Sequence, residues 1–159
     1  MARSIAAKKL HKAAESGDRD NAKEALDEGA DVNAKGGFFG SAWHAAASNG
    51  HREILRLLLD QPGAEPDIKD RSGRTPLWLA AREGFTDMVE TLMATGMVDP
   101  CSGSITGRNA LWWPSSNGHT DVVRLLLKAG VDPHMSCENG MTSLDVAQRN
   151  GHLELVSLF

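Results

Sequence analysis

Small and apolar residues recur at helical spacing along most of the chain, and the pattern is clearest between residues 70 and 100. Leu77, Ala80 and Ala81 fall on one face of a short predicted helix, since positions three and four apart lie on the same side. A second apolar stripe follows at Met88, Val89, Leu92 and Met93. The pattern predicts two short helices, each with one apolar face that the pair alone is too small to bury.

The residues at the boundaries of these helices support the same assignment. Thr75 is a good N-cap, and Pro76 follows at the first helical position, where a missing N–H costs nothing. Gly73 suits a tight turn that needs positive φ, and Gly84 and Gly96 each suit a helix end. The stretch therefore predicts a turn followed by two helices that reverse direction at Gly84.

The same unit recurs along the whole chain. The glycine between the two helices returns at steps of 33, 34, 34 and 33 residues, at Gly17, Gly50, Gly84, Gly118 and Gly151. Apolar columns keep register with it: Leu10, Trp43, Leu77, Leu111 and Leu144 before it, and Ala22, Leu55, Val89, Val123 and Val156 after it. We therefore expect the units to stack and to bury a continuous core.

Three motifs accompany this period: Thr-Pro-Leu-Trp-Leu-Ala-Ala at 75–81, Asn-Gly-His at 49–51 and 117–119, and Gly-Ala-Asp-Val-Asn at 29–33. Together they resemble the ankyrin repeat, and the resemblance covers residues 10–159. It implies an all-α fold, a solenoid of stacked helix-turn-helix units with β-hairpin-like fingers at right angles to the helices. In such a fold the fingers and first helices form a concave binding groove.

On this basis we expect a single domain over residues 1–159. The expected copies are roughly 5–35, 36–70, 71–101, 102–134 and 135–159. The first is expected to act as an N-terminal cap, because Lys8 and Lys9 stand where Thr and Pro would be. The runs Gly-Gly-Phe-Phe-Gly-Ser-Ala at 36–42 and Leu-Trp-Trp at 111–113 look more like variants in long fungal ankyrin arrays.

The last copy stops at Phe159, within its second predicted helix. Leu155, Leu158 and Phe159 are therefore expected to have little covering them. A natural end and a fragment of a longer array both remain open.

Composition narrows the possible partners. Seventeen basic and 21 acidic residues give a formal net charge of −4, which argues against general binding to nucleic acid or to an anionic membrane. No apolar run approaches the ~20 residues of a membrane span, and none is long enough for a secretory signal. We expect an intracellular monomer, in the cytoplasm or also the nucleus.

No sequence motif points to catalysis. The chain lacks GxxxxGK[ST], HExxH and GxSxG, and Cys101 and Cys137 have neither zinc-ligand spacing nor a paired framework. The histidines fall at positions that the resemblance makes structural, including His11 and His44. We expect no enzyme activity, no cofactor, no metal site and no disulfide.

Candidate binding residues come from two sources. Phe38 and Phe39 in the second finger, and Trp78 and Trp112 in the first helices, either pack between copies or anchor a partner. The variable positions implied by the resemblance are the finger tips and the two residues before the inter-helix glycine. The full candidate set is Phe38, Phe39, Arg71, Arg74, Trp78, Arg82, Glu83, Arg108, Trp112, Asn117, Met141 and Arg149.

The fourth copy contains a local conflict. Pro114 stands where Ala46 and Ala80 occur in the second and third copies, near the middle of the first helix. A proline there removes a helical N–H and crowds the carbonyl four residues back, at a cost of ~3 kcal/mol in a helix interior. We expect this helix to be shortened, bent or strained.

The expected function is that of a non-catalytic protein-protein interaction module whose concave face binds a protein partner. The recurring arginines favour a partner with an acidic surface, because arginine makes oriented, bidentate contacts with carboxylates, and an aromatic-binding surface is a second possibility. Two alternatives stay open: a small regulator like the ankyrin inhibitors of kinases, and a structural fragment of a larger scaffold or receptor.

Overall fold

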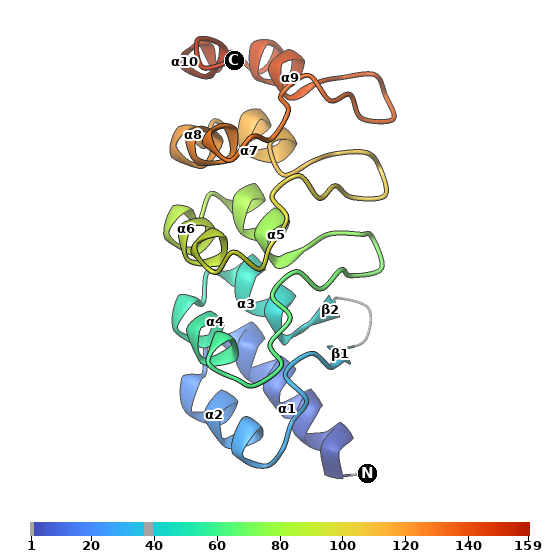
Figure 1. The fold of residues 1–159 in the computed structure, drawn as a ribbon, viewed down its shortest axis with the longest axis vertical. Coiled ribbons are helices and arrows are strands. Elements are labelled where there is room, and N and C mark those ends of the chain that lie inside the picture. The colour runs from blue at the N-terminus through green and yellow to red at the C-terminus, as the bar shows by residue number, and fades with distance from the viewer. Residues whose placement is uncertain (1, 37–39) are drawn as a thin grey trace.

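The computed structural model describes residues 2–36 and 40–159, which form ten helices and one short hairpin (Figure 1). The helices are stacked in pairs along the long axis of the molecule. The first helix of each pair is α1 (Ala2–Ser16), α3 (Ala42–Asn49), α5 (Pro76–Glu83), α7 (Trp112–Asn117) or α9 (Ser143–Arg149). The second is α2 (Arg19–Asp27), α4 (Arg52–Leu59), α6 (Thr86–Ala94), α8 (Thr120–Lys128) or α10 (Leu153–Val156). The hairpin consists of β1 (Lys35–Gly36) and β2 (Gly40–Ser41).

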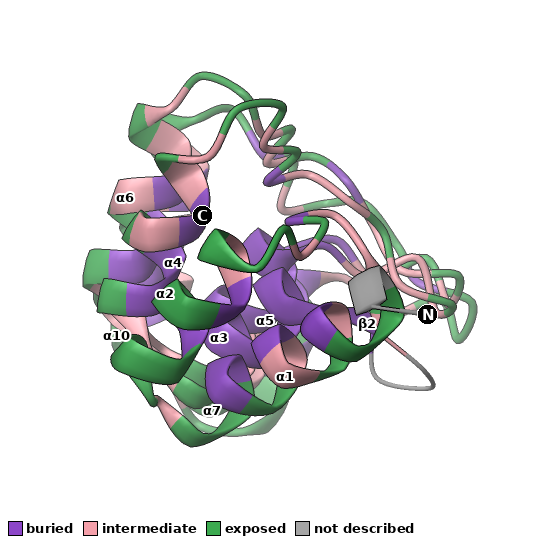
Figure 2. Cartoon of the chain, turned by 90° about the horizontal axis from the view of Figure 1, so that it is seen from below, coloured by how far each residue is buried: buried purple, intermediate pink, exposed green. Residues whose placement is uncertain are grey.

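The core lies between the layer of first helices and the layer of second helices, as the buried segments in Figure 2 show. One column of this core consists of Leu10, Trp43, Leu77 and Leu111, each at most 1% exposed. The column from the second helices consists of Ala22, Leu55, Val89 and Val123, all 0% exposed. The expected stacked core is thus confirmed for the first four copies, and the mostly helical architecture with it. In the fifth copy, Leu144 and Val156 are only half-buried.

The third pair begins and ends as its sequence predicts. Thr75 caps α5, since its Oγ1 accepts a hydrogen bond from the Trp78 N–H at 3.1 Å. Pro76 is the first residue of the helix, and Gly84 ends it with a φ of 79°. Gly73, in the preceding turn, has a φ of 72°. Local chemistry therefore sets both ends of α5 before any packing is considered.

The fourth pair is altered at its first helix, as Pro114 predicts. Helix α7 has six residues, whereas α3 and α5 each have eight. It begins at Trp112, so Pro114 lies in its first turn, where a backbone N–H has no intrahelical acceptor. The residues just before it form a turn in which Asn109 Oδ1 accepts from the Leu111 N–H at 3.1 Å. The helix is shortened to accommodate the proline.

The fingers extend to one side of the helix layers and contact each other along the stack (Figure 1). In the second copy, β1 and β2 pair antiparallel, with Lys35 opposite Ser41. Further along, the Ile105 N–H donates to the Ser72 carbonyl at 2.9 Å, and the Glu138 N–H donates to the Thr106 carbonyl at 3.2 Å. These bonds between successive fingers hold the fingers in register.

One expectation about the last copy is wrong. Leu155 is only 1% exposed, because α10 packs against both α8 and α9 and Leu155 belongs to the main core. Leu158 and Phe159 are partly buried against the same core. Within α10, Leu155 therefore packs onto the preceding helices, whereas Leu153 is 74% exposed.

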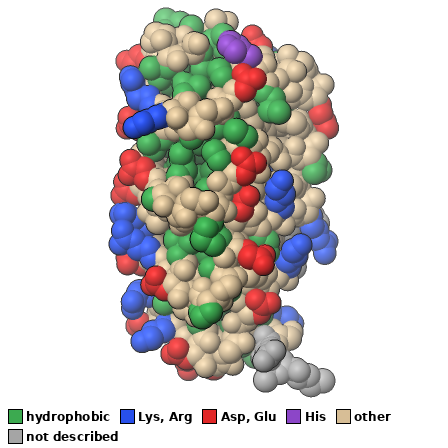
Figure 3. All heavy atoms as spheres, viewed as in Figure 1, with side chains coloured by type: hydrophobic (Ala, Val, Ile, Leu, Met, Phe, Trp, Pro, Cys, Tyr) green, Lys and Arg blue, Asp and Glu red, His purple; other side chains and the backbone are tan. Residues whose placement is uncertain are grey.

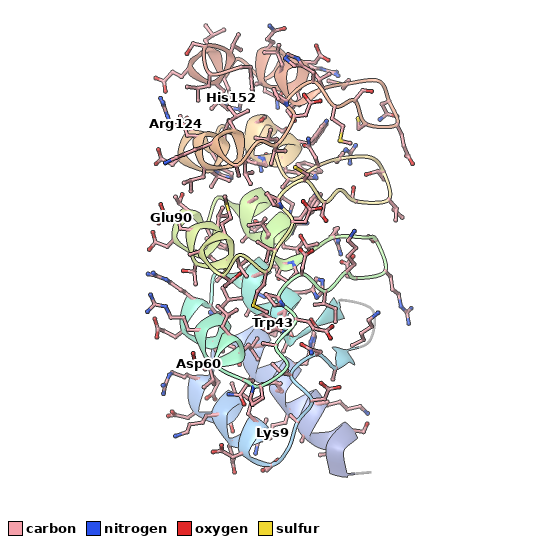
Figure 4. All side chains as sticks on the ribbon, in the orientation of Figure 1. Lys9, Trp43, Asp60, Glu90, Arg124 and His152 are labelled. Atoms are coloured by element: carbon pink, nitrogen blue, oxygen red, sulfur yellow. The ribbon has the colours of Figure 1, made fainter. Side chains whose placement is uncertain are left out.

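The outer surface is charged along the layer of second helices. In the view of Figure 3, Lys, Arg, Asp and Glu side chains gather along that edge, while hydrophobic side chains show between the helices and the fingers. Glu90 on α6 and Arg124 on α8 point away from the stack in Figure 4, and both are exposed. Within residues 2–36 and 40–159, no helix combines the length and the apolar character that crossing a membrane requires.

Candidate functional site

A groove of about 330 Å³ runs across the first helices of the first three pairs. It lies where the fingers project away from these helices, an arrangement that Figure 2 shows along the stack. Its lining consists of His11, Glu15, Ala45, Ser48, Asn49, Arg74, Leu79 and Arg82. Polar and charged side chains thus surround a narrow apolar floor, and two of them are candidates predicted from the sequence.

Trp78 lies beside this groove and links two copies. Its ring is 5% exposed, and the guanidinium carbons of Arg74 and Arg82 lie 5.9 and 5.8 Å from the ring centroid. The indole Nε1 donates to the Arg108 carbonyl in the next copy at 3.0 Å. This burial favours packing between copies over direct partner anchoring as the role of Trp78. The ring also makes cation–π contacts with two groove arginines.

Arg74 is held in a fixed orientation by Asp70. The Asp70 side chain is 1% exposed, and its Oδ2 accepts from Arg74 Nε at 2.7 Å. Its Oδ1 accepts from the backbone N–H groups of Ser72 at 2.8 Å and Arg74 at 2.9 Å. The carboxylate therefore orders the third finger and leaves the two terminal nitrogens of Arg74 for the groove.

Arg82 has a carboxylate partner of its own. Its Nε donates to Glu83 Oε1 at 2.6 Å, and the side chains of Arg82 and Glu83 are 29% and 36% exposed. With Arg74 paired to Asp70 and Arg82 to Glu83, the charges of the two groove arginines are balanced within the chain. These two arginines therefore offer oriented N–H donors to a partner and little net positive charge.

A second cluster of tryptophan and arginine lies one copy further on. The guanidinium carbon of Arg108 is 4.3 Å from the Trp112 ring centroid and 5.4 Å from that of Trp113. The two rings meet edge to face, with centroids 4.8 Å apart and an interplanar angle of 75°. Trp112 is 9% exposed and packs against Met141 and buried residues of the fifth copy. Packing between copies is therefore part of its role too.

The other candidates are spread more widely. Arg149 Nη1 lies 3.9 Å from Met141 Sδ, so these two side chains adjoin the second cluster. Arg71 is exposed near the tip of the third finger. Asn117 Nδ2 donates to the Arg82 carbonyl at 3.1 Å, which gives that side chain a structural bond between copies. Phe38 and Phe39 lie outside the described residues.

His44 has the structural role that the resemblance implied. Its Nδ1 accepts from the Ser41 N–H at 3.0 Å, so Nε2 carries the proton and donates to the Arg74 carbonyl at 3.0 Å. Burial lowers the pKa of His44 below its usual value, which favours this neutral form. The imidazole therefore links the second and third copies, as Trp78 links the third and fourth.

Several groove residues were missed at the sequence level. Glu15, Ser48 and Asn49 occupy the same two positions before the inter-helix glycine that identified Arg82 and Glu83. Their position in the repeat is therefore a sequence signal for the groove in the first two copies as well. Asp70 and Trp113 were also missed, because their importance depends on which arginine they contact in three dimensions.

Cys101 and Cys137 are both free thiols, one exposed and one buried. Among residues 2–36 and 40–159, no group of three or more His, Cys, Asp or Glu side chains is arranged to hold a metal ion.

Comparison with known proteins agrees with the fold. The family model described as ankyrin repeats (3 copies) matches residues 10–102 and again 95–159. A stretch of 66 residues, 41% of the chain, is 41% identical to delta-latroinsectotoxin-Lt1a of Latrodectus tredecimguttatus and covers 5% of that protein. A stretch of 49 residues, 31% of the chain, is 49% identical to E3 ubiquitin-protein ligase XB3 of Oryza sativa subsp. japonica and covers 11% of it.

A third relative is protein phosphatase 1 regulatory subunit 12A of Mus musculus, which is 49% identical over 45 residues, 28% of the chain and 4% of that protein. The chain thus matches only a small part of the length of each of these relatives. The family model, by contrast, accounts for nearly all of residues 10–159. The chain belongs to the ankyrin-repeat family.

Proposed function

We propose that the chain is a non-catalytic module that binds a protein partner in the groove across α1, α3 and α5. Ankyrin repeats are in general protein-protein interaction modules, and the relatives matched here include a phosphatase regulatory subunit. The observation that carries the proposal is the groove of about 330 Å³, into which Arg74 and Arg82 are held by Asp70, Glu83 and the Trp78 ring.

The mechanism that follows from this geometry is rigid display. Each groove arginine has one intramolecular carboxylate that restricts its rotamers, so less side-chain entropy is lost when a partner binds. The stacked helices present Leu79 and Ala45 as small apolar surface between these polar groups. Partner binding then requires little reordering of the scaffold, which remains an intracellular monomer in this proposal.

The test is affinity capture from a native cell lysate with the intact chain and the double variant Arg74→Glu, Arg82→Glu. The matched control is Arg56→Glu, Arg124→Glu, which changes net charge equally on exposed residues of α4 and α8. We expect a partner that the intact chain and the control retain and the groove variant loses. If the groove variant retains the same proteins as the intact chain, the binding site lies elsewhere.

A further inference from the structure

The third and fourth copies carry an arginine and a tryptophan at matching positions. Arg74 and Trp78 correspond to Arg108 and Trp112, each 34 residues later. In the third copy both side chains have an acceptor within the chain: Arg74 Nε donates to Asp70, and Trp78 Nε1 donates to the Arg108 carbonyl. This pair of donors is therefore fully satisfied.

The fourth copy lacks both acceptors. The position of Asp70 is taken by Ser104, whose hydroxyl bonds to the Thr106 hydroxyl at 2.8 Å. Arg108 Nε and Trp112 Nε1 are both buried and have no hydrogen-bond partner among the described residues. No described carboxylate forms an ion pair with Arg108 either. The Arg108 guanidinium lies over the Trp112 ring, with Cζ 4.3 Å from the ring centroid.

Leaving a buried donor without an acceptor is unfavourable, and more so for a charged group. A carboxylate is the group that satisfies the arginine in the third copy, through a charge-assisted hydrogen bond. Arg108 is only half-buried, so the outer part of its guanidinium is open to an incoming group. Arg108 has no carboxylate partner among the described residues, so a carboxylate from another protein can pair with it.

We propose that the fourth copy is a carboxylate-binding subsite, in which an Asp or Glu side chain of the partner pairs with the exposed part of the Arg108 guanidinium, beside the Trp112 ring. The proposal rests on the proposed function, because it assigns the partner an acidic residue, but it concerns a different copy from the groove arginines. Trp113 forms the second aromatic wall, with its centroid 5.4 Å from Arg108 Cζ. The partner carboxylate thus balances the charge of Arg108, as Asp70 balances that of Arg74, but through the exposed part of the guanidinium.

The test uses a synthetic probe. The capped peptide acetyl-Gly-Ser-Gly-Asp-Gly-Ser-Gly-amide is titrated into the 15N-labelled chain, and the indole N–H signals are followed by NMR. The peptide with Asn in place of Asp is the neutral control, and the Trp112→Phe variant identifies the Trp112 signal. We expect a saturable shift of the Trp112 signal with the Asp peptide and at least tenfold weaker binding of the Asn peptide.

Three variants separate the subsite from general charge effects. Arg108→Gln is expected to weaken binding of the Asp peptide at least tenfold, whereas Arg124→Gln on α8 leaves it unchanged. Ser104→Asp supplies an internal carboxylate as Asp70 does in the third copy, so it is expected to abolish the shift. Ser104→Asn, of the same shape but neutral, keeps it. Thermal unfolding of each variant confirms that the fold is intact.

An absent shift, an equal response to the Asn peptide, or full binding by the Ser104→Asp variant would each overturn the subsite. None of these outcomes depends on lysate capture. If lysate capture places a partner in the groove but the Asp peptide does not bind, the proposed function holds and the carboxylate subsite is wrong. If the Asp peptide binds but the groove variant still captures the same proteins, the subsite holds and the main binding surface lies nearer the fourth copy.

Discussion

The imidazole of His119 lies so close to Gly84 that a Cβ added to this glycine would stand 2.6 Å from Nδ1. The same arrangement recurs along the stack, because each of the first four inter-helix glycines lies close to a ring from the next copy, whereas Gly151 has nothing within 4 Å of an added Cβ. The pairs are Gly17 with His51, Gly50 with Phe85, Gly84 with His119 and Gly118 with His152. Glycine is required here both for its positive φ and for this close approach.

Gly84→Ala is therefore expected to lower the free energy of unfolding by about 2–4 kcal/mol, from a strained φ of 79° together with the clash against His119. Gly96→Ala is the matched control, since Gly96 has a φ of 65° but nothing within 4 Å of an added Cβ. It should cost only about 1–2 kcal/mol. Urea unfolding measures both, and equal losses would show that the ring contact contributes nothing.

Asp67→Asn is expected to stabilise the protein at neutral pH by about 1 kcal/mol, the value of one hydrogen bond. Asn33, one copy earlier, uses Nδ2 to donate to the Gly63 carbonyl at 2.7 Å and Oδ1 to accept from the Glu65 N–H. Asp67 occupies the same position but lacks a donor, and its Oδ1 is buried without a partner among the described residues. Urea midpoints at pH 7 give the comparison.

The pH dependence of that gain has a definite sign. Burial, aided by the Asp99 charge, raises the pKa of Asp67 above its usual value. The folded state therefore holds the proton more tightly than the unfolded state does. The contribution of Asp67 to the free energy of unfolding is highest below its unfolded-state pKa and is lost as the pH rises through the folded-state pKa. The extra stability of the Asp67→Asn variant should therefore decrease as the pH is lowered. A stability difference that does not change with pH would contradict this.

The helices and the core were predictable from the sequence because their causes are local or periodic. Thr75, Pro76 and Gly84 set the ends of α5 through their own side chains and backbone, and the spacing of apolar residues set its buried face. The shortening of α7 followed from the same logic, since a proline has no N–H wherever it occurs. The copy boundaries stay predictions.

The candidate site was less predictable, because its chemistry depends on pairing. The sequence shows many arginines and carboxylates, but only the geometry of the third finger shows that Asp70 forms an ion pair with Arg74. Ser104 and Arg108 become informative only once that pair is known. Leu155 was assigned wrongly for a related reason: the last helix packs toward α8 as well as α9.

Pro114→Ala is expected to lengthen α7 at its N-terminus. An alanine restores the N–H that can donate to the Ala110 carbonyl four residues back, as in an unbroken helix. The start of α7 should then move from Trp112 toward Ala110, with a change in unfolding free energy within about 1 kcal/mol, because lost chain stiffness offsets the added bond. Hydrogen exchange of the new alanine amide is the measurement, and an unprotected amide would contradict the extension.

Asp70→Asn is expected to lower the free energy of unfolding by about 2–3 kcal/mol, far more than Glu83→Gln, although each removes one carboxylate partner of a groove arginine. Asp70 is 1% exposed and accepts three hydrogen bonds, so an amide in its place turns a donor toward Arg74 Nε and leaves a half-buried cation unpaired. The Arg82–Glu83 pair is open to solvent, and its loss should cost less than about 1 kcal/mol. Urea unfolding of the two variants side by side tests the difference. Similar losses would mean that Asp70 does not order the third finger, and the contrast drawn between Arg74 and Arg108 would then lose its basis.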